Sequence, residues 1–359
     1  MELNRITEYN VLNTPWPLPD ESIDCCVTSP PYWNLRDYEI AGQLGLEKTP
    51  EEFIEKMVVV FNEVKRVLKP TGTFWLNIGD SYASTAKNRT PKQAQAKSTL
   101  NGSTKKQATV LKQKSKIVSG LKEKDVVGVP WMLAFALRSA GWYLRQDIIW
   151  HKPNPMPESV TDRCTKSHEY IFLLSKSPKY YYDQDAILEP ISPNTHARLS
   201  QDLQNQIGSL RANGGKKSNG NMKAVGRKLC DTGVGWGRLS HLSPDDNRTR
   251  PPRIKNNSSF NAAMAIMPEK RNKRSVWTVA TQSFSEAHFA TFPEKLITPC
   301  ILAGCPKDGI VLDPFIGAGT TGLVAMSNDR KFIGFELNPK YIKIANKRLK
   351  QKFGMFYNP

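Results

Sequence analysis

Residues 313–321 of this 359-residue chain read Asp-Pro-Phe-Ile-Gly-Ala-Gly-Thr-Thr. They follow a short apolar run at residues 309–312 and lead into a helical pattern at residues 320–326, after which residues 331–335 form a second apolar run. A strand, a glycine turn, a helix and a second strand in this order predict one βαβ unit. The stretch therefore predicts an α/β fold with the glycine turn at the carboxyl end of a strand.

The glycine turn indicates a nucleotide-like ligand. Gly317, Gly319 and Gly322 satisfy the dinucleotide fingerprint, and Glu336 ends the next strand, where a carboxylate accepts hydrogen bonds from ribose hydroxyls. NAD is one ligand that fits this pattern. However, Asp313 ends the first strand, and its carboxylate would repel a pyrophosphate but suits a ligand with an ammonium or sulfonium group. These residues favour S-adenosylmethionine over NAD.

The rest of the chain extends the α/β pattern on both sides of this unit. Nearly uninterrupted apolar strands are typical of a sheet that is covered on both faces. We therefore predict a doubly wound, mixed but mainly parallel sheet of the Rossmann type. The expected strands are residues 22–28, 73–78, 143–150 and 170–175, and the expected helices are residues 50–68, 130–140, 292–303 and 339–350.

A second distinctive segment, Thr-Ser-Pro-Pro-Tyr at residues 28–32, ends the first predicted strand. An exocyclic amine on a base is a poor nucleophile, and its methylation requires acceptors that hold its N–H bonds. The Pro30-Pro31 pair fixes a stiff turn whose carbonyls are such acceptors, and Ser29 adds a hydroxyl beside them. Tyr32 offers an aromatic face to a base swung out of the duplex, worth roughly 1 to 3 kcal/mol. An isolated segment of this kind is also typical of an ordinary tight loop.

Together the two segments resemble the amino-methylating DNA methyltransferases, in the permuted β group in which the catalytic motif precedes the cofactor motif. Residues 332–338 (Phe-Ile-Gly-Phe-Glu-Leu-Asn) match the acidic motif that follows. The resemblance covers roughly residues 1–82, 125–185 and 276–350. One departure is Asn10, since members of this family often carry an acidic residue there.

The resemblance implies an S-adenosylmethionine-dependent enzyme and assigns its site residues. Ser29, Pro30, Pro31 and Tyr32 are implied to handle the target amine. A serine at the first position is commoner among cytosine-N4 enzymes than among adenine-N6 enzymes, so cytosine N4 is the preferred target and adenine N6 the alternative. The cofactor residues are implied to be Asp313, Phe315, Gly317, Gly319, Thr320, Thr321 and Glu336. Phe292 and Pro293 open a predicted helix whose free backbone N–H groups could meet the cofactor carboxylate.

Charge is concentrated in two segments of a chain with a formal net charge of +18. Residues 81–122 hold ten Lys or Arg and no acid, and residues 186–275 hold sixteen against six acids. This pattern favours double-stranded DNA as the partner. We predict a catalytic half at residues 1–185 with a mobile basic loop at residues 84–120. We further predict target recognition by the insertion at 186–275 and a cofactor-binding half at residues 276–359.

Three other activities were weighed against this one. A cytosine-C5 enzyme would need a thiol nucleophile on a Pro-Cys loop, and Pro299-Cys300 is such a dipeptide, but it lies in an apolar helical pattern. RNA and protein amide methyltransferases usually place the cofactor motif first. A DNA-binding protein with an inactive methyltransferase core remains a remote alternative.

The remaining features concern the protein's setting. The six cysteines match neither a paired zinc pattern nor a small disulfide framework, so we expect no metal and a reducing cytoplasm, in a prokaryotic cell or a phage-infected host. We also expect no membrane segment. A cognate restriction endonuclease is a further expected partner, and the sequence leaves the oligomeric state open.

Overall fold

The computed structural model of the protein describes residues 2–38, 40–84, 120–191, 270–282 and 292–358. The chain divides into two compact units. Unit 1 comprises Met1–Ile187 and Arg274–Pro359, and unit 2 comprises Leu188–Lys273. The predicted basic loop, apart from its end residues 84 and 120, and nearly all of the predicted recognition insertion lie outside the described residues. In unit 2 the described part is a short antiparallel pair, β6 (Glu189–Pro190) and β7 (Lys270–Arg271).

Unit 1 is built on an eight-stranded sheet, counted over the described residues, with the order β1-β10-β9-β2-β3-β5-β4-β8. Every neighbouring pair is parallel except the two that involve β5, which runs antiparallel to both β3 and β4. The predicted mixed, mainly parallel sheet is therefore confirmed. The strands are β1 (Arg5–Glu8), β2 (Ile23–Thr28), β3 (Leu68–Ile78), β4 (Tyr143–His151), β5 (His168–Ser175), β8 (Val276–Thr278), β9 (Ile310–Asp313) and β10 (Lys331–Glu336).

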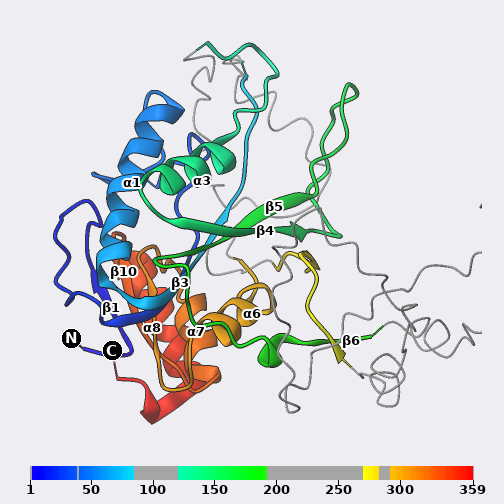
Figure 1. The fold of residues 1–359 in the computed structure, drawn as a ribbon. Coiled ribbons are helices and arrows are strands. Elements are labelled where there is room, and N and C mark those ends of the chain that lie inside the picture. The colour runs from blue at the N-terminus through cyan, green and yellow to red at the C-terminus, as the bar shows by residue number, and fades with distance from the viewer. Residues whose placement is uncertain (1, 39, 85–119, 192–269, 283–291, 359) are drawn as a thin grey trace, which may run out of the picture. The chain divides into compact units, whose positions relative to one another are not determined.

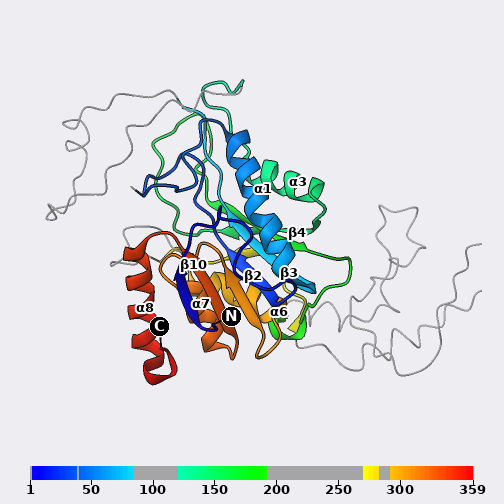
Figure 2. The same ribbon diagram turned by 90° about the vertical axis from the view of Figure 1, so that its left-hand side faces the viewer.

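Helices cover both faces of this sheet. One face carries α1 (Pro50–Val67) and α3 (Val129–Ser139), and the other carries α6 (Glu294–Gly304), α7 (Thr320–Ser327) and α8 (Pro339–Phe353) (Figure 1). Figure 2 shows α8 beside α7 and β10. Two short 3-10 helices, η1 (Asp185–Ile187) and η2 (Gly354–Phe356), complete the described elements. Two apolar clusters, one on each face, form the core. Among the described helices, none has the length and apolar character that crossing a bilayer requires.

The chain changes direction at the β9-β2 pair in the middle of the sheet. From β2 the chain passes through α1 to β3 on one side, and from β9 it passes through α7 to β10 on the other. Adjacent parallel strands whose connections diverge in this way define a topological switch point, and ligands bind at the carboxyl ends of the strands there. The fold thus places the ends of β2 and β9 at the expected binding edge.

Local sequence explains where the helix between β2 and β3 begins. The Thr49 side chain accepts a hydrogen bond from the Glu52 backbone N–H at 3.2 Å, and Pro50 occupies the first turn. The apolar residues at helical spacing, including Phe53, Met57 and Val60, are fully buried against the sheet. Helix α1 therefore packs its apolar side against the sheet as it connects β2 to β3, the parallel strand beside it.

The largest differences from the sequence-based prediction within the eight-stranded sheet concern β1, β8 and β3. Neither β1 nor β8 was predicted, because these edge strands have four and three residues and each buries only one side chain. The strand predicted at 73–78 begins earlier, at Leu68. The register jumps from the pair Ile23 and Leu68 to the pair Cys25 and Thr73, so the predicted turn residues between them form an irregularity within β3.

Candidate active site at the carboxyl ends of the central strands

The two segments singled out in the sequence meet at the switch point. Thr28, the last residue of β2, donates from Oγ1 to Oδ1 of Asp313, the last residue of β9, at 2.5 Å. These residues are 285 positions apart in the chain. The other carboxylate oxygen accepts from Thr321 Oγ1 at 2.6 Å, and Oδ1 also accepts from the Phe315 N–H at 3.0 Å. Asp313 therefore joins the Ser-Pro-Pro-Tyr loop to the glycine turn and to the start of α7.

The Asp313 carboxylate is enclosed, with 1% of its surface exposed. Burial raises its pKa to about 6, although the hydrogen bonds from Thr28, Thr321 and Phe315 oppose that rise. All three donors are electrically neutral. The Asp313 carboxylate therefore holds these three residues in place, but none of them carries a positive charge that would balance its negative charge.

Glu336 occupies the equivalent end of β10, next to β9. Its Oε2 accepts from the Gly317 N–H at 2.9 Å, and its Oε1 accepts from the Asn338 N–H at 2.8 Å. Burial raises its pKa, while these backbone hydrogen bonds oppose the change. Because a carboxylate offers about four acceptor positions, both oxygens keep capacity for further donors.

The three glycines of the turn have different surroundings. Gly317 has a φ of 51°, and a Cβ built there meets nothing closer than the Phe315 carbonyl oxygen at 3.9 Å. By contrast, a Cβ on Gly319 would lie 2.9 Å from Ala345 of α8, and one on Gly322 would lie 2.9 Å from the Phe332 ring. The second and third glycines are therefore required for packing, while the first faces open space where a ligand can approach.

The remaining predicted cofactor residues lie near this turn or at the start of α6. Thr320 and Thr321 begin α7 and are buried, and Phe315 is partly buried. Pro293 is the extended N-cap of α6, a helix that contacts both β2 and α7, and Phe292 before it packs on the same core. Cys300 lies inside α6 with 1% exposure, as expected for a packed cysteine and not for a loop nucleophile.

The Ser-Pro-Pro-Tyr loop leaves β2 at the same edge, and its tyrosine is held by polar side chains. The Tyr32 hydroxyl donates to Glu169 Oε2 at 2.6 Å and lies 3.4 Å from Asn77 Oδ1. Burial and the nearby Glu169 carboxylate raise the pKa of the Tyr32 phenol, against the opposing effect of the Ser29 hydroxyl. The phenol is therefore protonated at neutral pH.

Trp33 and Glu47 hold the chain that follows Tyr32 in place. Trp33 is buried, and its Nε1 donates to the Glu47 carbonyl at 3.0 Å. The Glu47 carboxylate in turn accepts from the Gly45 N–H at 2.8 Å and from Lys56 at 3.1 Å. These contacts fix the loop, as preorganised acceptors require.

Sequence reasoning did not identify three of the residues that shape this edge. Thr28 was quoted in its motif without a role, Asn77 was not singled out, and Glu169 was noted in the segment His168-Glu169-Tyr170 as the start of a strand, with a role at the pocket edge left open. Asn77 lies near the end of β3, whereas Glu169 lies near the start of β5. A polar residue close to the carboxyl end of an apolar strand could have indicated Asn77. Glu169 shares this edge because β5 is antiparallel, and the pattern of apolar residues does not reveal strand direction.

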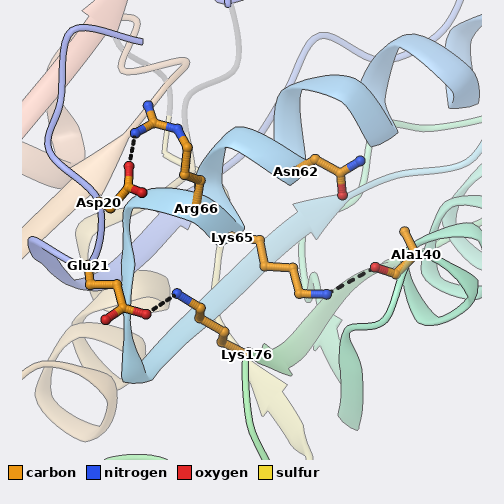
Figure 3. Close-up of a pocket in the computed structure, with 7 residues that line it drawn as sticks. All are labelled: Asp20, Glu21, Asn62, Lys65, Arg66, Ala140 and Lys176. Carbon is orange, nitrogen blue, oxygen red and sulfur yellow. Dashed lines mark hydrogen bonds and ion pairs between the residues drawn. The ribbon is translucent and has the colours of Figure 1, made fainter. Parts of the chain in front are cut away.

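A surface hollow lies at the opposite edge of the sheet, beside the amino-terminal end of β2 (Figure 3). It is formed around the start of β2, the end of α1 and the residue that follows β5, and its charged groups are paired with protein partners. Arg66 pairs with Asp20, Lys176 Nζ lies 2.9 Å from Glu21, and Lys65 donates to the Ala140 carbonyl at 3.0 Å. Its residues are Asp20, Glu21, Asn62, Lys65, Arg66, Ala140 and Lys176.

Comparison with known proteins decides the family. A family profile for N6 and N4 enzymes, described as DNA methylase, matches residues 23–347. The chain belongs to this DNA methylase family. It is 40% identical over 352 residues to the type II methyltransferase M.Cfr9I of Citrobacter freundii, covering 97% of this chain and 89% of the relative. It is 39% identical over 332 residues to M.SmaI of Serratia marcescens, covering 92% and 86%.

Solved structures share the fold. The PvuII DNA methyltransferase, described as cytosine-N4-specific, aligns with a TM-score of 0.54 at 17% identity over 96% of this chain and 85% of that one. TTHA0409 of Thermus thermophilus, a putative DNA modification methylase in complex with S-adenosyl-L-methionine, aligns with a TM-score of 0.52 at 18% identity over 98% and 95%. The predicted family and fold class are therefore confirmed, and the family is that of S-adenosylmethionine-dependent DNA methyltransferases.

Proposed function

We propose that this DNA methyltransferase transfers the methyl group of S-adenosylmethionine to the exocyclic N4 of cytosine in duplex DNA, after the base is flipped out. The observation that carries the proposal is the hydrogen bond between Thr28 and Asp313. It brings the loop suited to an amine and the turn suited to the donor to one edge of the sheet. Neither segment alone supports methyl transfer to a base.

The residues present fit the donor. S-adenosylmethionine supplies an electrophilic methyl carbon on a positively charged sulfur. Asp313 and Glu336 are carboxylates whose donors in this structure are neutral hydroxyls and backbone N–H groups, so a cationic ligand supplies the charge that these partners lack. Gly317 leaves the space for its approach, and Glu336 has acceptor capacity for the ribose hydroxyls. Phe315, Gly319, Thr320 and Thr321 shape the wall, and Phe292 and Pro293 begin the helix assigned to the donor's carboxylate.

The loop residues handle the target amine. The Ser29 hydroxyl and the carbonyls of the Pro30-Pro31 turn accept hydrogen bonds from the amine, which lets the nitrogen become pyramidal and direct its lone pair outward. The Tyr32 ring stacks on the base. Once methylated, the nitrogen carries a positive charge and readily loses a proton to water, so no histidine is assigned as a base.

Two observations favour cytosine N4 over adenine N6. The first loop position is Ser29, which the family resemblance associates with cytosine-N4 enzymes. The second is the shared fold with PvuII DNA methyltransferase, which is described as cytosine-N4-specific. Because both target amines donate to the same kind of acceptor, the target atom depends on the shape of the base pocket.

The two basic segments complete the proposal. We assign target recognition to residues 186–275, contact with the DNA backbone to residues 84–120, and donor binding to the half at 276–359. Similarity to proteins named type II methyltransferases supports a restriction-modification setting in a prokaryotic or phage-infected cell. A restriction endonuclease acting on the same site is the corresponding partner.

Nucleoside analysis tests the proposed function. Purified protein is incubated with duplex DNA and isotopically labelled S-adenosylmethionine, the DNA is digested, and the nucleosides are separated by mass spectrometry. We expect labelled N4-methylcytosine, and far less of it from a Tyr32→Ala preparation after the same incubation time. Labelled N6-methyladenine would move the assignment to the adenine alternative. Absence of any methylated nucleoside, with the donor still bound, would indicate an inactive core.

A further inference from the structure

Glu169 contacts two side chains at once, the tyrosine of the Ser-Pro-Pro-Tyr loop and Lys152. Its Oε2 accepts from the Tyr32 hydroxyl at 2.6 Å, and its Oε1 pairs with the ammonium of Lys152. Both side chains of this pair are mostly buried, with 16% of Glu169 and 19% of Lys152 exposed. Lys152 Nζ also lies 4.4 Å from the centroid of the Trp150 ring. The carboxylate is therefore fixed between a phenol and an ammonium that is itself held in place.

Contacts from β3 restrict the same carboxylate and the same ring. Asn77 Nδ2 donates to the Tyr170 carbonyl at 3.1 Å and to Glu169 Oε2 at 3.4 Å. Gly79 follows β3, and a Cβ there would lie 2.7 Å from the Tyr32 ring and 3.2 Å from the Glu169 carboxyl carbon. Three neighbouring strands, β3, β5 and β4, thus contribute to one arrangement of the tyrosine.

We propose that Glu169 is the positioning residue for Tyr32, holding the ring in the orientation in which its face receives the flipped base. The proposal rests on the proposed methyl transfer to a base, since it gives the ring its task. Stacking depends on the angle of the ring, and a hydrogen bond at the far end of a phenol limits how that angle varies. The ion pair with Lys152 holds the carboxylate in place, and a phenol that donates to a paired carboxylate makes a charge-assisted hydrogen bond.

A measurement without DNA tests the contact itself. In protein labelled with carbon-13 in its tyrosine rings, the Tyr32 signal is assigned by its disappearance in Tyr32→Phe. Glu169→Ala should shift this signal because it removes the acceptor. The matched control is Asp162→Asn, which breaks the exposed pair between Asp162 and Lys124 at 2.6 Å and should leave the Tyr32 signal in place.

Kinetics test the positioning role. Under single-turnover conditions, Glu169→Ala should slow methyl transfer about tenfold, the fold-change that corresponds to one hydrogen bond to a charged group. Donor affinity, measured by calorimetry, should stay within about twofold, because Glu169 acts on the base side of the site. Glu169→Gln keeps a neutral hydrogen-bonding partner and should recover to within about threefold of wild type.

A double-mutant cycle separates positioning from a general structural effect. If Glu169 acts through the phenol, Glu169→Ala causes no further loss in a Tyr32→Phe background. A second tenfold loss in that background, or an unmoved Tyr32 signal in Glu169→Ala, overturns the proposal. A wild-type chain that methylates no DNA overturns the proposed function instead, and the positioning of the ring then stands or falls on the NMR comparison.

Discussion

Charged side chains lie both at the switch-point edge, where β2 and β9 end, and at the opposite edge with the hollow. The two groups of side chains differ in their hydrogen-bonding and ion-pair partners. At the edge with the hollow, Arg66 pairs with Asp20 (Figure 3). It also donates to Glu63 at 2.9 Å. Although burial alone raises it, the pKa of Glu63 is lowered overall by the hydrogen bonds and charge of Arg66 and by the Trp16 N–H. At the switch-point edge, the donors to Asp313 and Glu336 among the described residues are neutral, and both pKa values are raised.

This difference separates a structural charge cluster from a site prepared for a charged ligand. A carboxylate paired with a guanidinium is already compensated, so a bound cation adds little. A buried carboxylate with neutral donors pays a desolvation penalty that a cation relieves. The charged groups around the hollow therefore compensate one another, while the switch-point edge is where we propose that the donor binds.

The largest expected effect follows from removing the tyrosine ring at the switch-point edge. Tyr32→Ala should slow single-turnover methyl transfer at least about 100-fold, because both the stacking surface and its placement are lost. Donor affinity should remain within about twofold by calorimetry. A loss of donor binding as large as the loss of rate would contradict the separation of the two roles.

The second prediction concerns the pH dependence of stability. The pKa of Asp313 is raised to about 6 in the folded protein from 3.8, so its contribution to stability is complete below pH 4 and is lost as the pH rises through 6. The difference amounts to about 3 kcal/mol. Asp313→Asn should remove this loss.

Urea unfolding at pH 4.5 and pH 7.5 measures the difference. The free energy of unfolding of Asp313→Asn minus that of the wild type should be larger at pH 7.5 than at pH 4.5. If the gap between the two proteins is the same at both pH values, Asp313 does not titrate in this range and the electrostatic contrast between the edges is wrong.

Two glycines of the same turn form a matched pair. Gly319→Ala should lower the free energy of unfolding by about 2 kcal/mol, because φ is 81° and the new Cβ would lie 2.9 Å from Ala345. Gly317→Ala should cost about 1 kcal/mol, since its φ is 51° but the space is open. The main effect of Gly317→Ala should be on the donor, whose affinity should fall about tenfold because the new Cβ occupies the open space. Equal effects of both substitutions on donor binding would show that Gly317 does not face the ligand.

The smallest effect is expected at the opposite edge. Lys176→Ala removes the partner of Glu21 in an ion pair whose carboxylate is 52% exposed. It should change the free energy of unfolding by less than about 1 kcal/mol and leave methyl transfer unchanged within about twofold. A loss of activity comparable to that of Gly317→Ala would place a functional site in this hollow.

Much of this contrast could be predicted from the sequence. Asp313 and Ser29 follow apolar runs that became β9 and β2, so both segments were expected at strand ends. The direct bond between Thr28 and Asp313 was not predictable, because periodicity gives neither strand order nor the distance between residues 285 apart. The role of Glu169 depends on the antiparallel direction of β5, which its continuous apolar pattern does not encode.

Photolabelling tests the central claim, that the donor binds at the switch-point edge. The protein is irradiated with methyl-tritiated S-adenosylmethionine, digested with trypsin, and the labelled peptides are identified by mass spectrometry. We predict label in residues 308–330 and 332–340, which contain the glycine turn and Glu336. Label confined to residues 57–65 and 139–145, which line the opposite hollow, would contradict the account.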